Sequence, residues 1–174
     1  MLEHPLQRFF HSMRAKRPFD WVRFQRRDLL LIDHPLCQAV FSRQGAQLLH
    51  FQPQGERPLL WCASEWPALS SAPVRGGIPV CWPWFGSHPN GSEWPQHHPG
   101  SLVLEDGGWN RRLRIDKNVS AGSVIWHPGS RPVEQVEPGE AERFLCIGAA
   151  GYRPGGLILA PGERMRLSLA AGLQ

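Results

Sequence analysis

One stretch of the sequence, residues 75–86, combines residue types that suit recognition of a phosphorylated sugar. It reads Arg-Gly-Gly-Ile-Pro-Val-Cys-Trp-Pro-Trp-Phe-Gly. The guanidinium of Arg75 offers a planar fork of donors that can bind phosphate or carboxylate at two points. The side chains of Trp82, Trp84 and Phe85 offer flat apolar faces against which a sugar ring can stack. We therefore interpret these four residues as a candidate binding site for a sugar phosphate.

The same stretch also has a purely structural interpretation. Paired glycines allow a backbone path that a Cβ would block, and the two prolines stiffen the turns that follow. Aromatic clusters belong to a protein core more often than to a ligand site. On this interpretation the stretch is a tight turn into a buried strand, and Arg75 is held in a salt bridge. Composition alone favours the structural interpretation.

The motif resembles the signature of the hexose-6-phosphate mutarotases, also called glucose-6-phosphate 1-epimerases, of the aldose-epimerase superfamily. The resemblance extends to four further segments, at residues 31–35, 44–49, 124–129 and 143–147. It covers most of residues 28–170, but not the whole of the family's sequence. It implies a galactose-mutarotase-like β-sandwich (supersandwich), here partial, and interconversion of the anomers of a hexose 6-phosphate without a cofactor.

Mutarotation requires a base and an acid on opposite sides of the sugar ring, because the anomeric hydroxyl loses a proton while the ring oxygen gains one. The resemblance implies a glutamate directly after the apolar segment 144–147, but Gly148 stands there. It also implies a histidine in a middle segment, which this chain lacks, because residues 101–106 already resemble a part near the family's C-terminus. We therefore regard the chain as truncated, assign no catalytic residue, and expect it to be inactive or very weakly active.

His97 is a second candidate contact to phosphate, and this role is implied only by the resemblance. It matches the first residue of the family's His-Gly-Phe-Ala-Arg motif, whereas His98 departs from the glycine and the arginine has no counterpart. The neighbouring Pro95, Pro99 and Gly100 predict a turn, so the alternative is a solvent-exposed pair of histidines. No carboxylate or cysteine converges on the pair, and we assign no metal site.

Other carboxylates offer no evident replacement for the missing base. Glu140 and Glu142 lie just upstream of segment 143–147, in a Pro-Gly-Glu-Ala-Glu turn that we expect to be solvated. No sequence pattern places either of them near Arg75.

Short strand-like segments are expected to position the motif. Apolar or alternating segments separated by Gly, Pro and Asn turns are typical of a β-meander. They lie at residues 28–33, 36–42, 46–52, 59–62, 111–115, 123–126, 143–147, 157–159 and 164–169. In segment 111–115, Leu113 and Ile115 should face inward while Arg112 and Arg114 face outward. Apart from one short helix at residues 5–13, the sequence predicts an all-β sandwich.

The 174 residues are expected to form a basic and aromatic N-terminal segment, residues 1–27, followed by one truncated sandwich domain, residues 28–174. The net charge is +4, and seven of the 19 basic residues precede residue 28. Basic and aromatic residues together can bind a nucleic-acid strand. The rest of the chain is nearly balanced in charge and has no nucleic-acid motif, so we expect the segment to pack its aromatic residues against the body of the protein.

The remaining composition bounds the location and the partners. Four widely spaced cysteines predict neither a disulfide nor a zinc site. No run reaches the roughly 18 apolar residues of a membrane helix, and the N-terminus does not resemble a signal peptide, so we expect a cytoplasmic protein without a membrane partner. Loss of the middle of a sandwich leaves open strand edges, which predicts a homo-oligomer.

Three functions remain open from the sequence. The chain is a family member related to hexose-6-phosphate anomer interconversion, a non-catalytic remnant that binds a hexose 6-phosphate weakly or binds a partner, or a basic nucleic-acid-binding module. The missing glutamate and histidine favour the remnant over the active enzyme. The charge balance after residue 27 disfavours nucleic acid.

Overall fold

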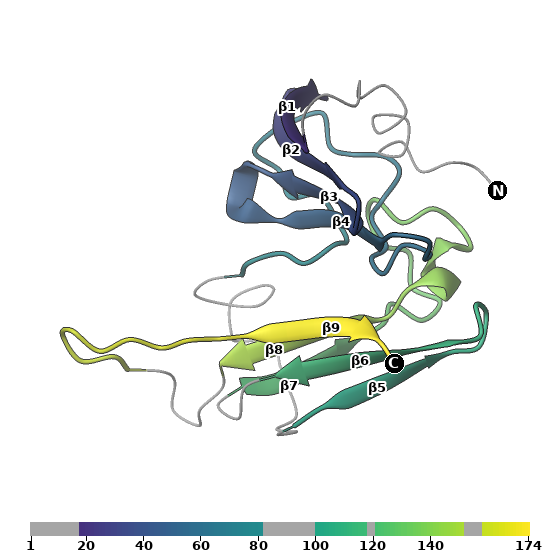
Figure 1. Ribbon diagram of the computed structural model, residues 1–174. Helices are drawn as coiled ribbons and strands as arrows, with labels where there is room; N and C mark the ends of the chain where they lie inside the picture. Colours follow the sequence, from purple (N-terminus) through teal and green to yellow (C-terminus); the bar gives the residue numbers. More distant parts are fainter. Residues whose placement is uncertain (1–17, 82–99, 118–120, 152–157) are drawn as a thin grey trace. The chain divides into compact units, whose positions relative to one another are not determined.

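A computed structural model describes residues 18–81, 100–117, 121–151 and 158–174 (Figure 1). These residues form nine β-strands and two short 3-10 helices, so the predicted all-β class is confirmed. They divide into two compact units, which lie within Met1–Trp82 with Pro128–Phe144, and within Pro83–His127 with Leu145–Gln174. Within the described residues, no helix is long and apolar enough to cross a membrane. The helix predicted at residues 5–13 lies outside them.

The first unit contains a four-stranded antiparallel meander in the order β1-β2-β3-β4 (Figure 1). Its strands are β1 Phe19–Phe24, β2 Arg27–His34, β3 Cys37–Ser42 and β4 Leu48–Pro53, and the 3-10 helix η1, Gln44–Ala46, joins the last two. The sequence predicted β2, β3 and β4. Alternate residues of β2, among them Leu29 and Leu31, are fully buried, which is the period-two pattern of a strand with one face on the core.

Strand β1 was not predicted, and the first strand was expected to begin at residue 28. The two-residue turn between β1 and β2 consists of Gln25 and Arg26, whose φ angles are 46° and 64°. Such turns usually contain asparagine or glycine, so the residues Gln25 and Arg26 gave no sign of a hairpin. The aromatic residues of β1 pack only in part, since Phe24 meets Trp66 edge-on at 5.1 Å while Trp21 is exposed.

The core of the first unit lies between the inner face of this sheet and the segment that follows β4. Cys62, Ala63, Trp66 and Val74 cover buried leucines and valines of β2, β3 and β4. The predicted strand at residues 59–62 is wrong, because Cys62 makes only an isolated bridge to Gly76. The segment turns across the sheet to close the core instead of extending the meander.

Arg27 fixes the loop that leads from this core to the motif. Its side chain is buried, and its two terminal amino groups donate hydrogen bonds to the carbonyls of Pro67, Leu69 and Ala72, each at 3.0 Å. The guanidinium also lies over the ring of Trp66, 5.7 Å from its centroid. Burial lowers the pKa of Arg27. This arginine of the basic N-terminal segment therefore has a structural role.

The second unit contains two small antiparallel sheets. One has the order β5-β6-β9 and the other pairs β7 with β8. The strands are β5 Leu102–Asp106, β6 Arg111–Lys117, β7 Ala121–Trp126, β8 Cys146–Gly151 and β9 Leu169–Leu173. On β6, Leu113 and Ile115 are buried while Arg112 and Arg114 are exposed, which confirms the predicted alternation.

The boundaries of the last strands differ from the prediction. The segment at residues 164–169 is not a strand, and β9 begins at its last residue and pairs through Ala170, Ala171 and Gly172. Strand β8 likewise begins three residues later than predicted and contains two glycines and two alanines. Small residues have low strand propensity, so pairing with a neighbouring strand determines these boundaries and local pattern does not.

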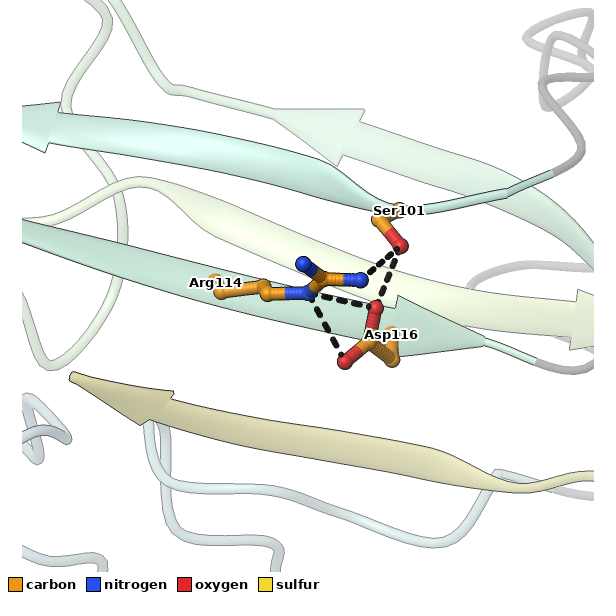
Figure 2. A network of polar contacts seen from close by, with 3 residues as sticks. All are labelled: Ser101, Arg114 and Asp116. Carbon is orange, nitrogen blue, oxygen red and sulfur yellow. Dashed lines mark hydrogen bonds and ion pairs between the residues drawn. The ribbon is translucent and has the colours of Figure 1, made fainter. Parts of the chain in front are cut away.

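Polar side chains on the solvent side of β6 form a small network (Figure 2). The Nε of Arg114 donates to both carboxylate oxygens of Asp116, at 3.0 and 3.1 Å, and its Nη2 donates to the Ser101 hydroxyl at 3.3 Å. The Ser101 hydroxyl donates in turn to Asp116. Hydrogen bonds from Ser101 and Arg114 lower the pKa of the Asp116 carboxyl. The network is exposed, so it adds little to stability.

Candidate functional site

The first residues of the motif lie in the first unit, between β4 and the segment around Trp61. The carbonyl of Arg75 accepts a hydrogen bond from the N–H of Ala63 at 3.0 Å. Ile78 exchanges two backbone hydrogen bonds with Leu48, at 2.8 and 3.2 Å, and the N–H of Gly77 donates to the carbonyl of Trp61 at 2.7 Å. Residues 75–78 are thus held from both sides by backbone hydrogen bonds, although residues 75–81 are not part of a strand.

The paired glycines are required by this close approach, as the sequence predicted. Gly76 has a φ of 103°, and a Cβ added there would lie 2.6 Å from both the Cα of Cys62 and the carbonyl oxygen of Trp61. Gly77 has a φ of 63°, and a Cβ there would overlap the carbonyl oxygen of Leu48. Both neighbours are backbone and cannot move aside as a flexible side chain would. Side chains larger than hydrogen are therefore excluded at both positions.

The side chain of Gln47 also supports this backbone. Its buried side-chain amide donates to the carbonyl of Val74 at 2.9 Å and to that of Gly76 at 2.6 Å. No role was predicted for Gln47, although it lies within one of the segments that carry the resemblance. Its two hydrogen bonds satisfy carbonyls on either side of Arg75, so it positions the motif.

The side chain of Arg75 is oriented by residues far along the chain. Its Nε donates to the carbonyl of Glu134 at 2.9 Å, and its backbone N–H donates to the side-chain carbonyl of Gln135 at 3.0 Å. The Gln135 amide then donates to the carbonyl of Pro73 at 3.1 Å. The sequence predicted no role for residues 134 and 135.

Glu140 is bound within the first unit, so the prediction of a solvated side chain is wrong. It lies in η2, Glu140–Arg143. One carboxylate oxygen accepts a hydrogen bond from the indole N–H of Trp61 at 2.8 Å, and the other accepts one from Arg143 at 2.6 Å. Trp61 also stacks on Phe144, with ring centroids 4.3 Å apart. Seventy-nine residues separate Trp61 from Glu140, so no local pattern could have revealed the pair.

Four of the five predicted binding residues, Trp82, Trp84, Phe85 and His97, lie outside the described residues. The fifth, Arg75, lies within the described residues and makes the contacts given above. Gly148 lies in β8 of the second unit, opposite Val124 of β7. A Cβ added to Gly148 would lie 3.8 Å from the Cβ of Val124, which is an ordinary contact. The strand therefore has room for a Cβ at this position, where the resemblance implies a glutamate, and packing does not require glycine there.

The remaining titratable groups near the motif do not form a reactive centre. Cys62 is buried beneath Gly76, and burial raises the pKa of its thiol to about 12, so it is protonated at neutral pH. Among the residues that the structure describes, no three histidine, cysteine or acidic side chains converge as a metal site would require. The described part of the site is therefore one oriented arginine on a rigid backbone.

Residues 28–101, which include the first unit's four-stranded sheet from β2 onward and the Arg-Gly-Gly turn, are similar in sequence to one known family. The family model described as aldose 1-epimerase matches residues 28–101. A protein of Escherichia coli K12 named "Putative glucose-6-phosphate 1-epimerase" is 49% identical over 59 residues, which are 34% of this chain and 20% of that protein. The protein of the same name from Salmonella typhimurium LT2 is 48% identical over 59 residues, with the same coverage. The resemblance predicted from the motif is confirmed.

The aligned part spans about a fifth of the length of these curated relatives. Two solved structures are also similar to this chain. The first, described as a "putative mutarotase (YeaD) from Salmonella typhimurium", has 23% identity and a TM-score of 0.44, and the alignment covers 70% of this chain and 51% of that one. The second, the structure of HI1317, has 19% identity and a TM-score of 0.40, with 66% and 54% covered.

Proposed function

We propose that the chain is a non-catalytic relative of the glucose-6-phosphate 1-epimerases that binds a hexose 6-phosphate weakly through Arg75. The observation that carries the proposal is Gly148. The resemblance implies the catalytic carboxylate at this position, and a glycine cannot remove the proton of the anomeric hydroxyl. The segment that would supply the acid histidine has no counterpart in the sequence.

Glu140 is an alternative source of a base in the first unit, and its contacts argue against that role. One oxygen accepts from the indole of Trp61 and the other from Arg143, so both are already committed to groups within the fold. A base also has to lie within hydrogen-bond reach of its proton. Glu140 therefore serves as a clamp between Trp61 and Arg143.

Binding of a sugar phosphate requires fewer precisely placed groups than catalysis does, and Arg75 is suited to such binding. Its backbone is fixed by Ala63 and Gln135, and its Nε by the carbonyl of Glu134, so the guanidinium loses little freedom when a ligand arrives. A charge-assisted hydrogen bond contributes about 1.5 to 3 kcal/mol. One such anchor does not offset the cost of immobilising a sugar phosphate, so we expect weak binding. Trp82 and Trp84 would add stacking on the sugar.

A fluorescence titration tests the proposal. Glucose 6-phosphate should quench tryptophan emission, whereas glucose should have a much smaller effect because it lacks the charge that Arg75 recognises. Arg75→Ala should abolish the difference between the two sugars. Arg112→Ala is the matched control, because Arg112 is an exposed arginine of the second unit that pairs with Glu105. Equal quenching by inorganic phosphate and glucose 6-phosphate, or an unchanged titration in Arg75→Ala, would refute sugar-phosphate recognition by this residue.

A further inference from the structure

The outer face of the four-stranded sheet carries large apolar side chains that are not part of the core. Register places Trp21 of β1 beside Leu30 of β2, and Leu30 beside Phe41 of β3. On the next row, Phe19 is beside Ile32. Phe19 and Trp21 are 57% and 56% exposed. The opposite face of the same sheet already packs on the core, so this apolar row is a second, separate surface.

This face combines a large exposed side chain with a hollow. The exposed Trp21 side chain forms one wall of a shallow hollow of about 310 Å³. The hollow is lined by Trp21, Leu30, Phe41, Ser42, Arg43 and Ala46. Its lining is almost entirely apolar, which suits a protein side chain better than a sugar or an anion. A surface with a projecting group next to a hollow can match a copy of itself about a two-fold axis, because each projection then enters the other's hollow.

The charges at the rim of this face also match a second copy. Asp28 lies between two arginines, 3.2 Å from Arg23 and 3.7 Å from Arg43. The rim therefore carries both signs, and a two-fold axis can place the acid of one copy opposite a base of the other. A partner with a uniformly acidic or basic surface would match only part of this rim. Charge thus favours an identical copy as the occupant.

The outer edge of the sheet is less suited to association than its face. Strand β1 is the outermost strand, and the N–H of Trp21 donates to the carboxylate of Asp20 at 2.9 Å. A capped N–H on an edge strand cannot pair with a new strand unless the cap is released. We propose that the chain forms a two-fold dimer through the outer face of β1, β2 and β3, centred on Trp21, and not through the edge of β1.

Sedimentation velocity over a wide concentration range tests this dimer with the full chain. The unmodified chain should show a monomer–dimer equilibrium. Trp21→Lys should raise the dimer dissociation constant by at least about tenfold, as expected for loss of a central aromatic anchor. Val103→Lys is the matched control, since Val103 is an exposed apolar residue on β5 of the second unit, 51% accessible, and should leave the constant unchanged.

A charge-pair experiment separates loss of the interface from loss of the fold. Trp21→Lys and Trp21→Glu should each be monomeric alone, but should form a mixed dimer when combined, because the two-fold axis brings residue 21 of both copies together. Asp20→Ala, which releases the edge N–H, should not strengthen association. A monomer at every concentration, failure of the mixture to pair, or stronger association of Asp20→Ala would overturn the proposal. The first of these results would indicate that residues 1–17 or another protein cover the face.

Discussion

Replacing Gly77 by alanine should be among the most destabilising small substitutions in the chain. At a φ of 63°, a residue with a Cβ costs about 1–2 kcal/mol relative to glycine. The new methyl would also overlap the carbonyl oxygen of Leu48 and lie 3.0 Å from the Cα of Leu49, so the backbone of β4 must move. Overpacking of this kind costs about 1–3 kcal/mol. The total of about 2–5 kcal/mol is large against the typical stability of a domain, about 5–15 kcal/mol.

Gly45→Ala provides the control for this prediction. Gly45 has almost the same φ, 65°, but nothing lies within 4 Å of the position of its Cβ. It should therefore incur only the conformational cost of about 1–2 kcal/mol. Urea unfolding of the three proteins, with equal m-values, gives the difference directly. If Gly77→Ala lowers the free energy of unfolding no more than Gly45→Ala does, the steric account of the paired glycines is refuted.

Three further results are expected. Arg27→Met should lower the free energy of unfolding by about 2–4 kcal/mol, because the carbonyls of Pro67, Leu69 and Ala72 lose their buried donor. Arg26→Met, at the exposed turn, should change it little, and equal effects of the two substitutions would contradict the structural role of Arg27. In the folded protein, iodoacetamide should modify the exposed Cys81 well before the buried Cys62. The free energy of unfolding should also fall as the pH rises above about 9, because the pKa of the Cys62 thiol, about 12 in the folded protein, is higher than in the unfolded chain. Gly148→Glu should fold with a circular dichroism spectrum like that of the unmodified chain, because its Cβ meets Val124 only at 3.8 Å; a loss of strand signal would show that the site is more crowded.

The strands that could be predicted are those whose side chains alternate between core and solvent. In β6 the alternation is visible in the sequence, and burial of Leu113 follows it. Strand β2 was predicted from a continuous apolar run, of which Leu29 and Leu31 face the core. Strands β8 and β9 are rich in glycine and alanine, which carry no such pattern, so their boundaries depend on pairing with β7 and β6. Strand β1 was missed because its turn lacks the usual residues.

Some residues of the candidate site could likewise be predicted from the sequence, and others could not. Arg75 and the paired glycines could be identified from the motif, because the close backbone approach requires glycine wherever it occurs. The residues that orient Arg75 could not, since Glu134 and Gln135 are about sixty positions away and approach it only in the folded chain. Glu140 was wrongly expected to be solvated, because a turn of alternating Pro, Gly and Glu usually is, and its partner Trp61 is equally remote.

We propose that the chain retains a sugar-phosphate contact but no mutarotase chemistry. Two-dimensional exchange NMR of glucose 6-phosphate in the presence of the protein measures that chemistry. The rate of anomer exchange should equal the spontaneous rate at every protein concentration. Gly148→Glu should leave that rate unchanged, because the acid partner is also missing and catalytic groups that act together are not additive. Exchange that increases in proportion to the concentration of the unmodified chain, and that is abolished by Arg75→Ala, would contradict the claim and would require an acid and a base not yet identified.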